Sequence, residues 1–150
     1  MPFYKDLQFG KIYENKANEY IDYDEIKIIN EKCKEYDLII TKNNINFKYE
    51  IKADRRAYYT NNMVIEYECR GRKSGIEATT ADYWLYFVII NSNNDIVYNI
   101  PVKELKEIIK NCKTVSGGDN FSSKMYIVKL DNIIKYKIDK ITKDNEDSNN

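Results

Sequence analysis

The sequence has 150 residues, a length that suits one compact domain able to bury a core of its own. It contains 24 acidic and 24 basic residues, so it lacks the strong positive charge of many nucleic-acid-binding proteins, although a local basic patch is compatible with a neutral total. It contains no histidine and only three, widely spaced cysteines, which argues against histidine-based catalysis, nearly all zinc sites and a disulfide framework.

The N-terminal part of the chain is expected to form a helix and then a strand. Four apolar residues recur at helical spacing and predict an amphipathic helix over residues 9–20: Phe9, Tyr13, Ala17 and Tyr20. Segment 24–29 alternates as a strand does, with Ile26 and Ile28 on one side. The wider apolar spacing up to Cys33 also fits a helix, but we favour the strand.

Strand patterns dominate the middle of the chain. Residues 36–41 are rich in β-forming types and predict a buried strand, which a Lys-Asn-Asn turn connects to the next one. From Ile45 to Ala53 apolar and polar residues alternate, so one face of this strand is expected to be buried and the other polar. Three further strands are predicted at 62–69, 83–91 and 95–100, and the second of these is apolar enough to be central.

The C-terminal part is expected to begin with a helix that opens at Pro101, whose apolar stripe consists of Val102, Leu105, Ile108, Ile109 and Cys112. Residues 116–120 are expected to form a loop and residues 125–130 a final strand, while 131–142 carry no firm signal. Residues 143–150 are polar and are expected to form a disordered tail. The whole pattern predicts one α/β or α+β domain over residues 1–142, with a mixed sheet and a helix on each flank.

Two acidic residues and a lysine are expected to meet on this sheet. Glu50 and Lys52 are two residues apart and project from the same strand face. Asp37 begins the preceding strand, and the short turn between the strands makes them antiparallel neighbours. Two carboxylates about 4 Å apart repel by roughly 4 kcal/mol at an effective dielectric near 20. Mg²⁺ would offset this repulsion, and an ammonium beside it suits phosphodiester hydrolysis.

This order of residues resembles the PD-(D/E)xK nuclease superfamily, in particular archaeal Holliday junction resolvases and related viral and phage endonucleases. Asp37 is followed thirteen residues later by Glu50-Ile51-Lys52, and Glu14 lies in the preceding helix. The resemblance implies a restriction-endonuclease-like mixed sheet flanked by helices. It also implies Mg²⁺, or Mn²⁺ as a substitute, bound by Glu14, Asp37, Glu50 and the carbonyl of Ile51. Lys52 would then assist the attacking water.

The resemblance extends beyond these residues. Tyr36 stands where the family name has proline, a position that varies widely. Segment 65–84 is similar to viral and phage members in which Ser, Thr and basic side chains lie near the DNA backbone. The expected DNA contacts are Arg55, Arg56, Arg70, Arg72, Lys73, Ser74, Thr79 and Thr80. Tyr58 and Tyr59 are the best candidates for contacting a base.

Each of these features also has a simpler explanation. Glu50 and Lys52 fit a solvated strand face, and Asp37 and Glu14 fit a turn and a helix surface. Glu66 and Glu68 fit a second solvated face, although either is positioned to reach the metal. Thr79 or Thr80 fits the cap of a helical turn at 81–84.

Taken in family order, the residues favour a Mg²⁺-dependent DNA endonuclease, with a homodimeric branched-DNA resolvase as the leading subtype. RNA is not excluded as a substrate. Two alternatives stay open: a non-catalytic nucleic-acid-binding or structural subunit that keeps the fold, and a small protein-interaction domain with an accidental Glu-x-Lys.

The sequence also predicts where the protein resides. Its first residues lack the apolar run of a signal peptide, and its longest apolar stretch, 83–90, is far too short to cross a bilayer. We therefore expect a soluble, intracellular protein with no membrane partner, and the odd number of cysteines fits a reducing compartment. The abundance of Tyr, Ile, Asn and Lys suggests an AT-rich genome, as in a virus or phage.

Overall fold

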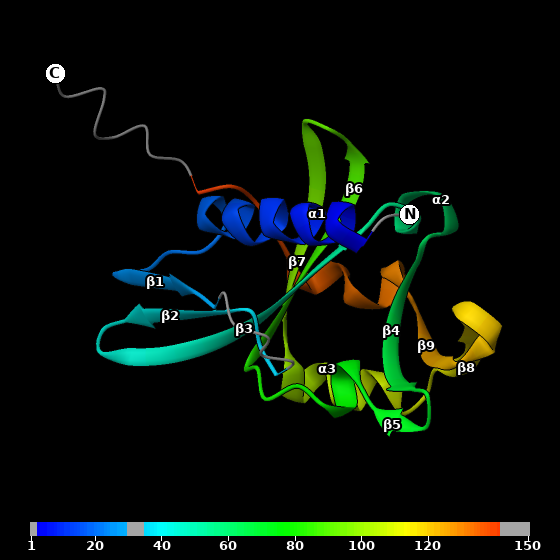
Figure 1. Ribbon diagram of the computed structural model, residues 1–150. Coiled ribbons are helices and arrows are strands. Elements are labelled where there is room, and N and C mark those ends of the chain that lie inside the picture. The colour runs from blue at the N-terminus through cyan, green and yellow to red at the C-terminus, as the bar shows by residue number, and fades with distance from the viewer. Residues whose placement is uncertain (1–2, 30–34, 142–150) are drawn as a thin grey trace, which may run out of the picture.

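The computed structural model describes residues 3–29 and 35–141, and within them the strands form two sheets (Figure 1). The main sheet has the order β1 (Glu25–Ile28), β2 (Leu38–Lys42), β3 (Ile45–Asp54), β6 (Tyr83–Asn91), β7 (Asn94–Pro101) and β10 (Lys137–Ile138). The second sheet has the order β5 (Arg72–Lys73), β4 (Asn62–Cys69), β9 (Ser123–Lys129) and β8 (Lys113–Gly117). The α-helices are α1 (Phe3–Lys16), α2 (Ala57–Thr60) and α3 (Val102–Ile109).

Short 3₁₀ helices complete the described structure. They are η1 (Ala17–Glu19), η2 (Gly75–Glu77), η3 (Asp119–Phe121) and η4 (Leu130–Tyr136). The chain is thus one mixed α+β domain, in agreement with the class expected from the sequence.

The main sheet is mixed because its strands are joined in two different ways. β2 and β3 form an antiparallel hairpin whose turn residues, Asn43 and Asn44, have φ values of 52° and 65°. Asparagine tolerates this left-handed region better than most residues do. β6 then pairs in parallel with β3, so that Lys52 stands beside Tyr86. The crossover between these parallel strands contains α2, β4 and β5, which leave the main sheet.

β6 separates two apolar clusters. On one face, Leu85 and Phe87 pack with Tyr13 and Tyr20 from α1 and the turn that follows it, and the two tyrosine rings meet Phe87 edge-on. On the other face, Trp84 and other β6 side chains pack against β4, β9 and α3. The central, buried position expected for this strand is therefore confirmed. The face of β3 that carries Glu50 and Lys52 points to the second of these layers, because their register partners on β6 are Trp84 and Tyr86.

Several expected elements have different limits or different neighbours. The first helix begins at Phe3 and ends in a 3₁₀ turn, whereas the strand preferred at 24–29 is confirmed. Pro101 is the last residue of β7 and precedes α3, so its expected place inside the helix was wrong by one residue. The helical turn expected at 81–84 was also wrong, because these residues lead directly into β6.

The C-terminal region contains more structure than the sequence predicts. β8 occupies part of the expected loop at 116–120, and its polar, largely exposed residues gave no strand signal. The strand expected at 125–130 is β9, but η4 and β10 follow it, so it is not the final strand. The tail at 143–150 and Cys33 lie outside the described residues. In the described ranges, no helix has the length and apolar character that crossing a membrane requires.

Candidate active site

Asp37 is fixed against β3 by two hydrogen bonds. Its backbone N–H donates to the carbonyl of Tyr49 at 2.8 Å, and its Oδ2 accepts from the N–H of Ile51 at 2.7 Å. Because Leu38 pairs with Tyr49 in the β2–β3 ladder, Asp37, which precedes Leu38, stands opposite Glu50. Directly opposed residues of antiparallel strands share a face. The sequence order and the hairpin thus bring the two carboxylates together, as the sequence predicts.

Lys52 completes this group from the same face of β3. Its Nζ lies 3.4 Å from Oε1 of Glu50 and 5.7 Å from the ring centroid of Trp84. Glu50 is only 9% exposed, whereas Lys52 is exposed. A buried carboxylate is therefore paired with an ammonium that remains open to solvent and to any ligand that approaches from outside.

The acidic groups repel one another in a partly desolvated environment. Burial is the largest influence and raises the pKa of Glu50 to about 7, with Asp37 and Glu14 acting in the same direction and Lys52 opposing them. Burial also raises the pKa of Glu14 to about 7, and the charge of Asp37 adds to this shift. The pKa of Asp37 is raised by burial, although the Ile51 N–H and Lys52 act against the shift. The carboxylates of Glu14, Asp37 and Glu50 are thus electrostatic neighbours.

The oxygen atoms of this group suit a hard divalent cation. Across residues 3–29 and 35–141, no three His, Cys, Asp or Glu side chains form a group that is ready to hold a metal ion. Mg²⁺ does not require such a cage, since it usually keeps several waters and takes one or two carboxylates together with substrate phosphates. Asp37 and Glu50 supply two such carboxylates, and the carbonyl of Ile51 lies between Glu50 and Lys52 along the strand.

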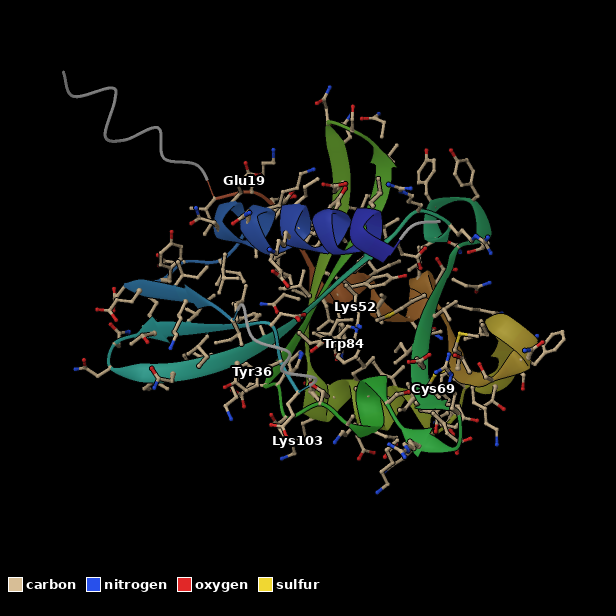
Figure 2. All side chains as sticks on the ribbon, in the orientation of Figure 1. Glu19, Tyr36, Lys52, Cys69, Trp84 and Lys103 are labelled. Atoms are coloured by element: carbon tan, nitrogen blue, oxygen red, sulfur yellow. The ribbon has the colours of Figure 1, made fainter. Side chains whose placement is uncertain are left out.

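A cleft of about 760 Å³ opens above Glu50 and Lys52. Its opposite wall comes from β4, β5 and the turn after them. Figure 2 shows Lys52 on β3 and Cys69 on β4, the elements of the two walls. Four polar or basic residues line that wall: Arg70, Arg72, Lys73 and Ser74. Glu66 lines it as well, whereas Glu68 pairs with Lys124 at 3.1 Å. The cleft therefore has a carboxylate and an ammonium on its floor and a largely basic rim.

The rim is held close to β4 by its backbone. The hairpin between β4 and β5 turns at Arg70 and Gly71, both of which have positive φ. Gly75 also has a positive φ of 49°, and a Cβ at this position would lie only 2.0 Å from the carbonyl oxygen of Glu66. The Oγ of Ser74 is buried without a hydrogen-bond partner in the described structure. Glycine at 75 thus allows the chain to approach β4 closely and to present its polar groups to the cleft.

Four of the residues expected to contact DNA do not line this cleft. Thr79 is buried, and its hydroxyl donates to the carbonyl of Glu35 at 2.6 Å and accepts from the N–H of Ala81 at 3.0 Å. The N–H of Thr80 also donates to the carbonyl of Glu35, at 3.0 Å. These threonines hold the chain just before Asp37, so we place them in the support of the site. Arg55 and Arg56 lie beyond the end of β3, and Arg55 lines a different cleft.

One supporting residue was not identified from the sequence. Asp54 accepts hydrogen bonds from the backbone N–H groups of Arg56 at 2.7 Å and Ala57 at 3.0 Å, and also from the hydroxyl of Tyr86. It thereby fixes the start of α2 at the end of β3, and an Asp just before a short helix is the signal that was available.

No protein-family model, curated protein or solved structure matches this chain.

Proposed function

We propose that this protein is a Mg²⁺-dependent DNA endonuclease of the PD-(D/E)xK type. One observation carries the proposal: buried Glu50 adjoins the ammonium of Lys52 on the floor of a cleft with a basic rim, and half-buried Asp37 is held beside Glu50 by its hydrogen bond to the Ile51 N–H. Carboxylates attract a divalent cation, and an ammonium with basic neighbours attracts phosphate.

The residues of the floor divide the work of hydrolysis. Asp37 and Glu50 would hold the metal ion, with Glu14 and the carbonyl of Ile51 as further oxygen donors. A bound divalent ion stabilises the negative charge that develops on the phosphate. Lys52 orients the attacking water by hydrogen bonding and adds positive charge beside the phosphate. A new bond then forms between water oxygen and phosphorus, the bond to the leaving sugar oxygen breaks, and that oxygen ends up protonated.

The residues of the rim bind the DNA backbone. Arg70, Arg72 and Lys73 are exposed along the wall opposite the floor, where their charges face an incoming strand. Contacts of this kind fix the register of a nucleic acid without reading its sequence.

A branched DNA is the substrate class that the family resemblance favours, and two symmetric cuts would require a homodimer, which light scattering measures directly. A strict monomer would count against the resolvase subtype. We also propose that the protein is intracellular.

Cleavage assays with matched variants test the enzyme. Linear, nicked, flapped and four-way DNA are incubated with and without Mg²⁺, and we expect cleavage only with the metal. Glu50→Ala and Lys52→Ala should each lower the rate by about 100-fold or more, the usual size of a lost transition-state interaction. Lys48→Ala is the control, because Lys48 shares the strand face but lies outside the cleft, over the ring of Tyr36. Full activity in a folded Lys52→Ala protein would remove the role assigned to Lys52.

A binding protein without catalysis is the second candidate. It is favoured by the fact that the described acidic residues do not form a ready-made metal group, whereas the basic rim alone would suffice to bind DNA. Calorimetric titration with Mg²⁺ separates the two functions. Binding that disappears in Glu50→Ala supports the enzyme, and DNA binding with no response to Mg²⁺ supports the binding protein.

A further inference from the structure

The main sheet ends at β1, which in the described structure pairs with β2 on one side and with no strand on the other. Figure 1 shows β1 and the hairpin of β2 and β3 extending away from the second sheet and from α3. The open side of an edge strand presents backbone N–H and C=O groups that can pair with another extended strand. β1 is therefore a place where a further strand can join the sheet.

The side chains of β1 divide between the two faces of the sheet. Ile26 and Ile28 are half-buried, and Ile26 packs against the apolar layer beneath α1. Glu25 and Lys27 are exposed on the opposite face, and within the described part of the chain neither forms an ion pair or a side-chain hydrogen bond. The edge thus carries two opposite charges, two residues apart, that have no partner within the described domain.

The sequence of β1 is complementary to itself in the antiparallel direction. When Ile26 stands opposite Ile26 of a second copy, Glu25 of each chain stands opposite Lys27 of the other. Directly opposed residues of antiparallel strands share a face, and opposite charges in these positions stabilise the pairing. One twofold axis through the isoleucines therefore produces two equivalent ion pairs.

The same charges select the register of such a pair. Two identical strands related by a twofold axis place one residue opposite itself. Centring the pair on Glu25 would oppose two carboxylates, and centring it on Lys27 would oppose two ammonium groups, both of which are destabilising. Centring it on Ile28 would place Lys27 opposite Ile29 and form no ion pair with it. The register centred on Ile26 is the one that satisfies both charges.

We propose that this protein dimerises by antiparallel pairing of β1 with β1 of a second copy, with Ile26 on the twofold axis. Charged side chains on an edge strand usually prevent association. In this register each charge meets its opposite, so the charges select a second copy of the chain over an unrelated strand. The inference rests on the proposed function, in which two symmetric cuts call for a homodimer, and it names the surface that forms the homodimer.

The pairing keeps the two candidate active sites on one face of the joined sheet. Lys27 stands opposite Ile39 of β2, and Ile39 stands opposite Lys48 of β3. These residues therefore share a face with Glu50 and Lys52. A twofold axis perpendicular to the sheet leaves that face on the same side in both copies. The arrangement is thus compatible with one DNA that meets both sites.

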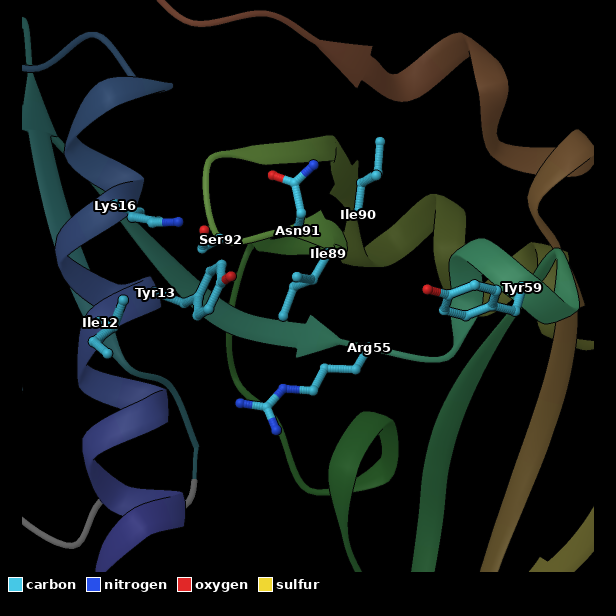
Figure 3. Close-up of a pocket in the computed structure, with 9 residues that line it drawn as sticks. All are labelled: Ile12, Tyr13, Lys16, Arg55, Tyr59, Ile89, Ile90, Asn91 and Ser92. Atoms are coloured by element: carbon cyan, nitrogen blue, oxygen red, sulfur yellow. The ribbon is translucent and has the colours of Figure 1, made fainter.

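A cleft of about 590 Å³ beside α1 is a weaker place for a second copy (Figure 3). Apolar and aromatic side chains such as Ile12, Tyr59 and Ile89 line much of it, and its Lys16 already binds Asp95 at 3.2 Å. The described lining includes basic but no acidic side chains. Two copies brought together at this cleft would therefore oppose like charges, which disfavours association.

Charge reversal tests the pairing by sedimentation equilibrium of the metal-free protein without DNA. Glu25→Lys and Lys27→Glu should each weaken the dimer by about 10- to 100-fold, because both ion pairs become like-charge pairs. The double variant should restore the dimer, since each new lysine faces a new glutamate. A mixture of the two single variants should also restore it, as heterodimers. Lys103→Glu, an exposed position on α3, changes the net charge as much as Lys27→Glu does and should leave the dimer unchanged.

A disulfide tests the register. Directly opposed Cα atoms lie about 4.5–5.5 Å apart, within the range that a disulfide spans, so Ile26→Cys should crosslink two copies under oxidised glutathione. In this register the two copies of residue 27 are about 8 Å apart, so Lys27→Cys should not crosslink. Val115→Cys lies at the middle of β8, the outer strand of the second sheet, and reports pairing there instead. The wild-type protein, with three cysteines of its own, gives the background, and circular dichroism checks folding.

The outcomes separate this inference from the proposed function. A dimer that each single reversal weakens and the double variant restores supports the inference. A monomer at every concentration, a dimer that the reversals leave unchanged, or crosslinking at residue 115 in place of residue 26 overturns it. If Mg²⁺-dependent cleavage is found without pairing at β1, the inference fails and the nuclease stands. If β1 pairs but no DNA is cleaved, the interface stands and the nuclease fails.

Discussion

Glu50 lies in an environment that favours its neutral form. Burial and the two neighbouring carboxylates raise its pKa from 4.5 to about 7, so the folded protein holds a proton on this group that the unfolded chain releases. The stability that depends on this proton is fully present below pH 4.5 and is lost as the pH rises through about 7. A metal ion would reverse this penalty, because it favours the ionised carboxylate.

We therefore expect Glu50→Gln to stabilise the metal-free protein at pH 8. A gain of about 1–3 kcal/mol in the free energy of unfolding is expected, since the amide has no charge to desolvate. Urea unfolding at pH 5 and pH 8 measures the effect, which should be small at the lower pH. Glu66→Gln, on the facing wall of the cleft, is the control and should show no such dependence. A Glu50→Gln protein with the wild-type pH profile would contradict the proposed electrostatics.

Gly75 determines how closely the basic rim approaches β4. Gly75→Ala would place a Cβ 2.0 Å from the Glu66 carbonyl oxygen in a left-handed backbone conformation. We expect a loss of roughly 2–4 kcal/mol in unfolding free energy, the range for a strained backbone site with a steric clash. Gly10→Ala is the contrasting change, because nothing lies within 4 Å of a Cβ there and the residue is helical. It should stabilise by about 0.5–1 kcal/mol in the same denaturation experiment.

Residue by residue, the sequence predicts the grouping of Asp37, Glu50 and Lys52 but not the surroundings of these residues. The grouping follows from local rules, namely a two-residue period and a short hairpin, and both hold in the structure. The burial of Glu50 does not follow from these local rules. It depends on elements far along the chain, which cover the β3 face whose residue pattern is polar. For the same reason Thr79 was expected at the DNA, although its hydroxyl is used inside the protein.

At the level of elements, the β2–β3 hairpin sets the register of the site. A shift of one residue would turn Glu50 and Lys52 to the opposite face. The turn that fixes this register has both central residues in the left-handed region of backbone conformation. Glycine adopts this region most easily, whereas alanine adopts it only with strain.

Asn44→Gly should therefore stabilise the protein by up to about 1 kcal/mol, and Asn44→Ala should destabilise it by about 1–2 kcal/mol. Thermal unfolding of the two variants measures the difference. Because φ at residue 44 is 65°, the sign of each change is a direct test of the turn. Stabilisation by alanine would show that the hairpin turns in another way.

The sequence reveals individual strands more readily than it reveals the sheet to which each belongs. β4 has the alternation of a strand, but nothing in its pattern shows that it pairs with β9, about sixty residues later, rather than with β3. β8 is almost entirely exposed, so it has no buried side to produce a hydrophobic period. Its strand conformation comes from pairing with β9, a contact that local residue types do not encode.

On the scale of the whole molecule, the cleft exists because the chain leaves the main sheet after β3 and builds a second sheet before it returns as β6. Glu50 and Lys52 on the floor belong to one sheet, and the basic rim belongs to the other or follows it. A protein with no net charge can therefore carry a local basic patch, which its overall composition conceals.

This basic rim makes the salt dependence of DNA binding a test of where DNA lies. Each phosphate contact contributes about 0.9 to the negative slope of log K against log salt concentration. The double variant Arg72→Gln with Lys73→Gln should therefore reduce the magnitude of the slope by about 2. Lys103→Gln with Lys106→Gln, an exposed pair on α3 outside the cleft, removes the same charge and should leave the slope almost unchanged. If both double variants reduce the slope equally, DNA responds to the total charge of the protein and the rim has no special role.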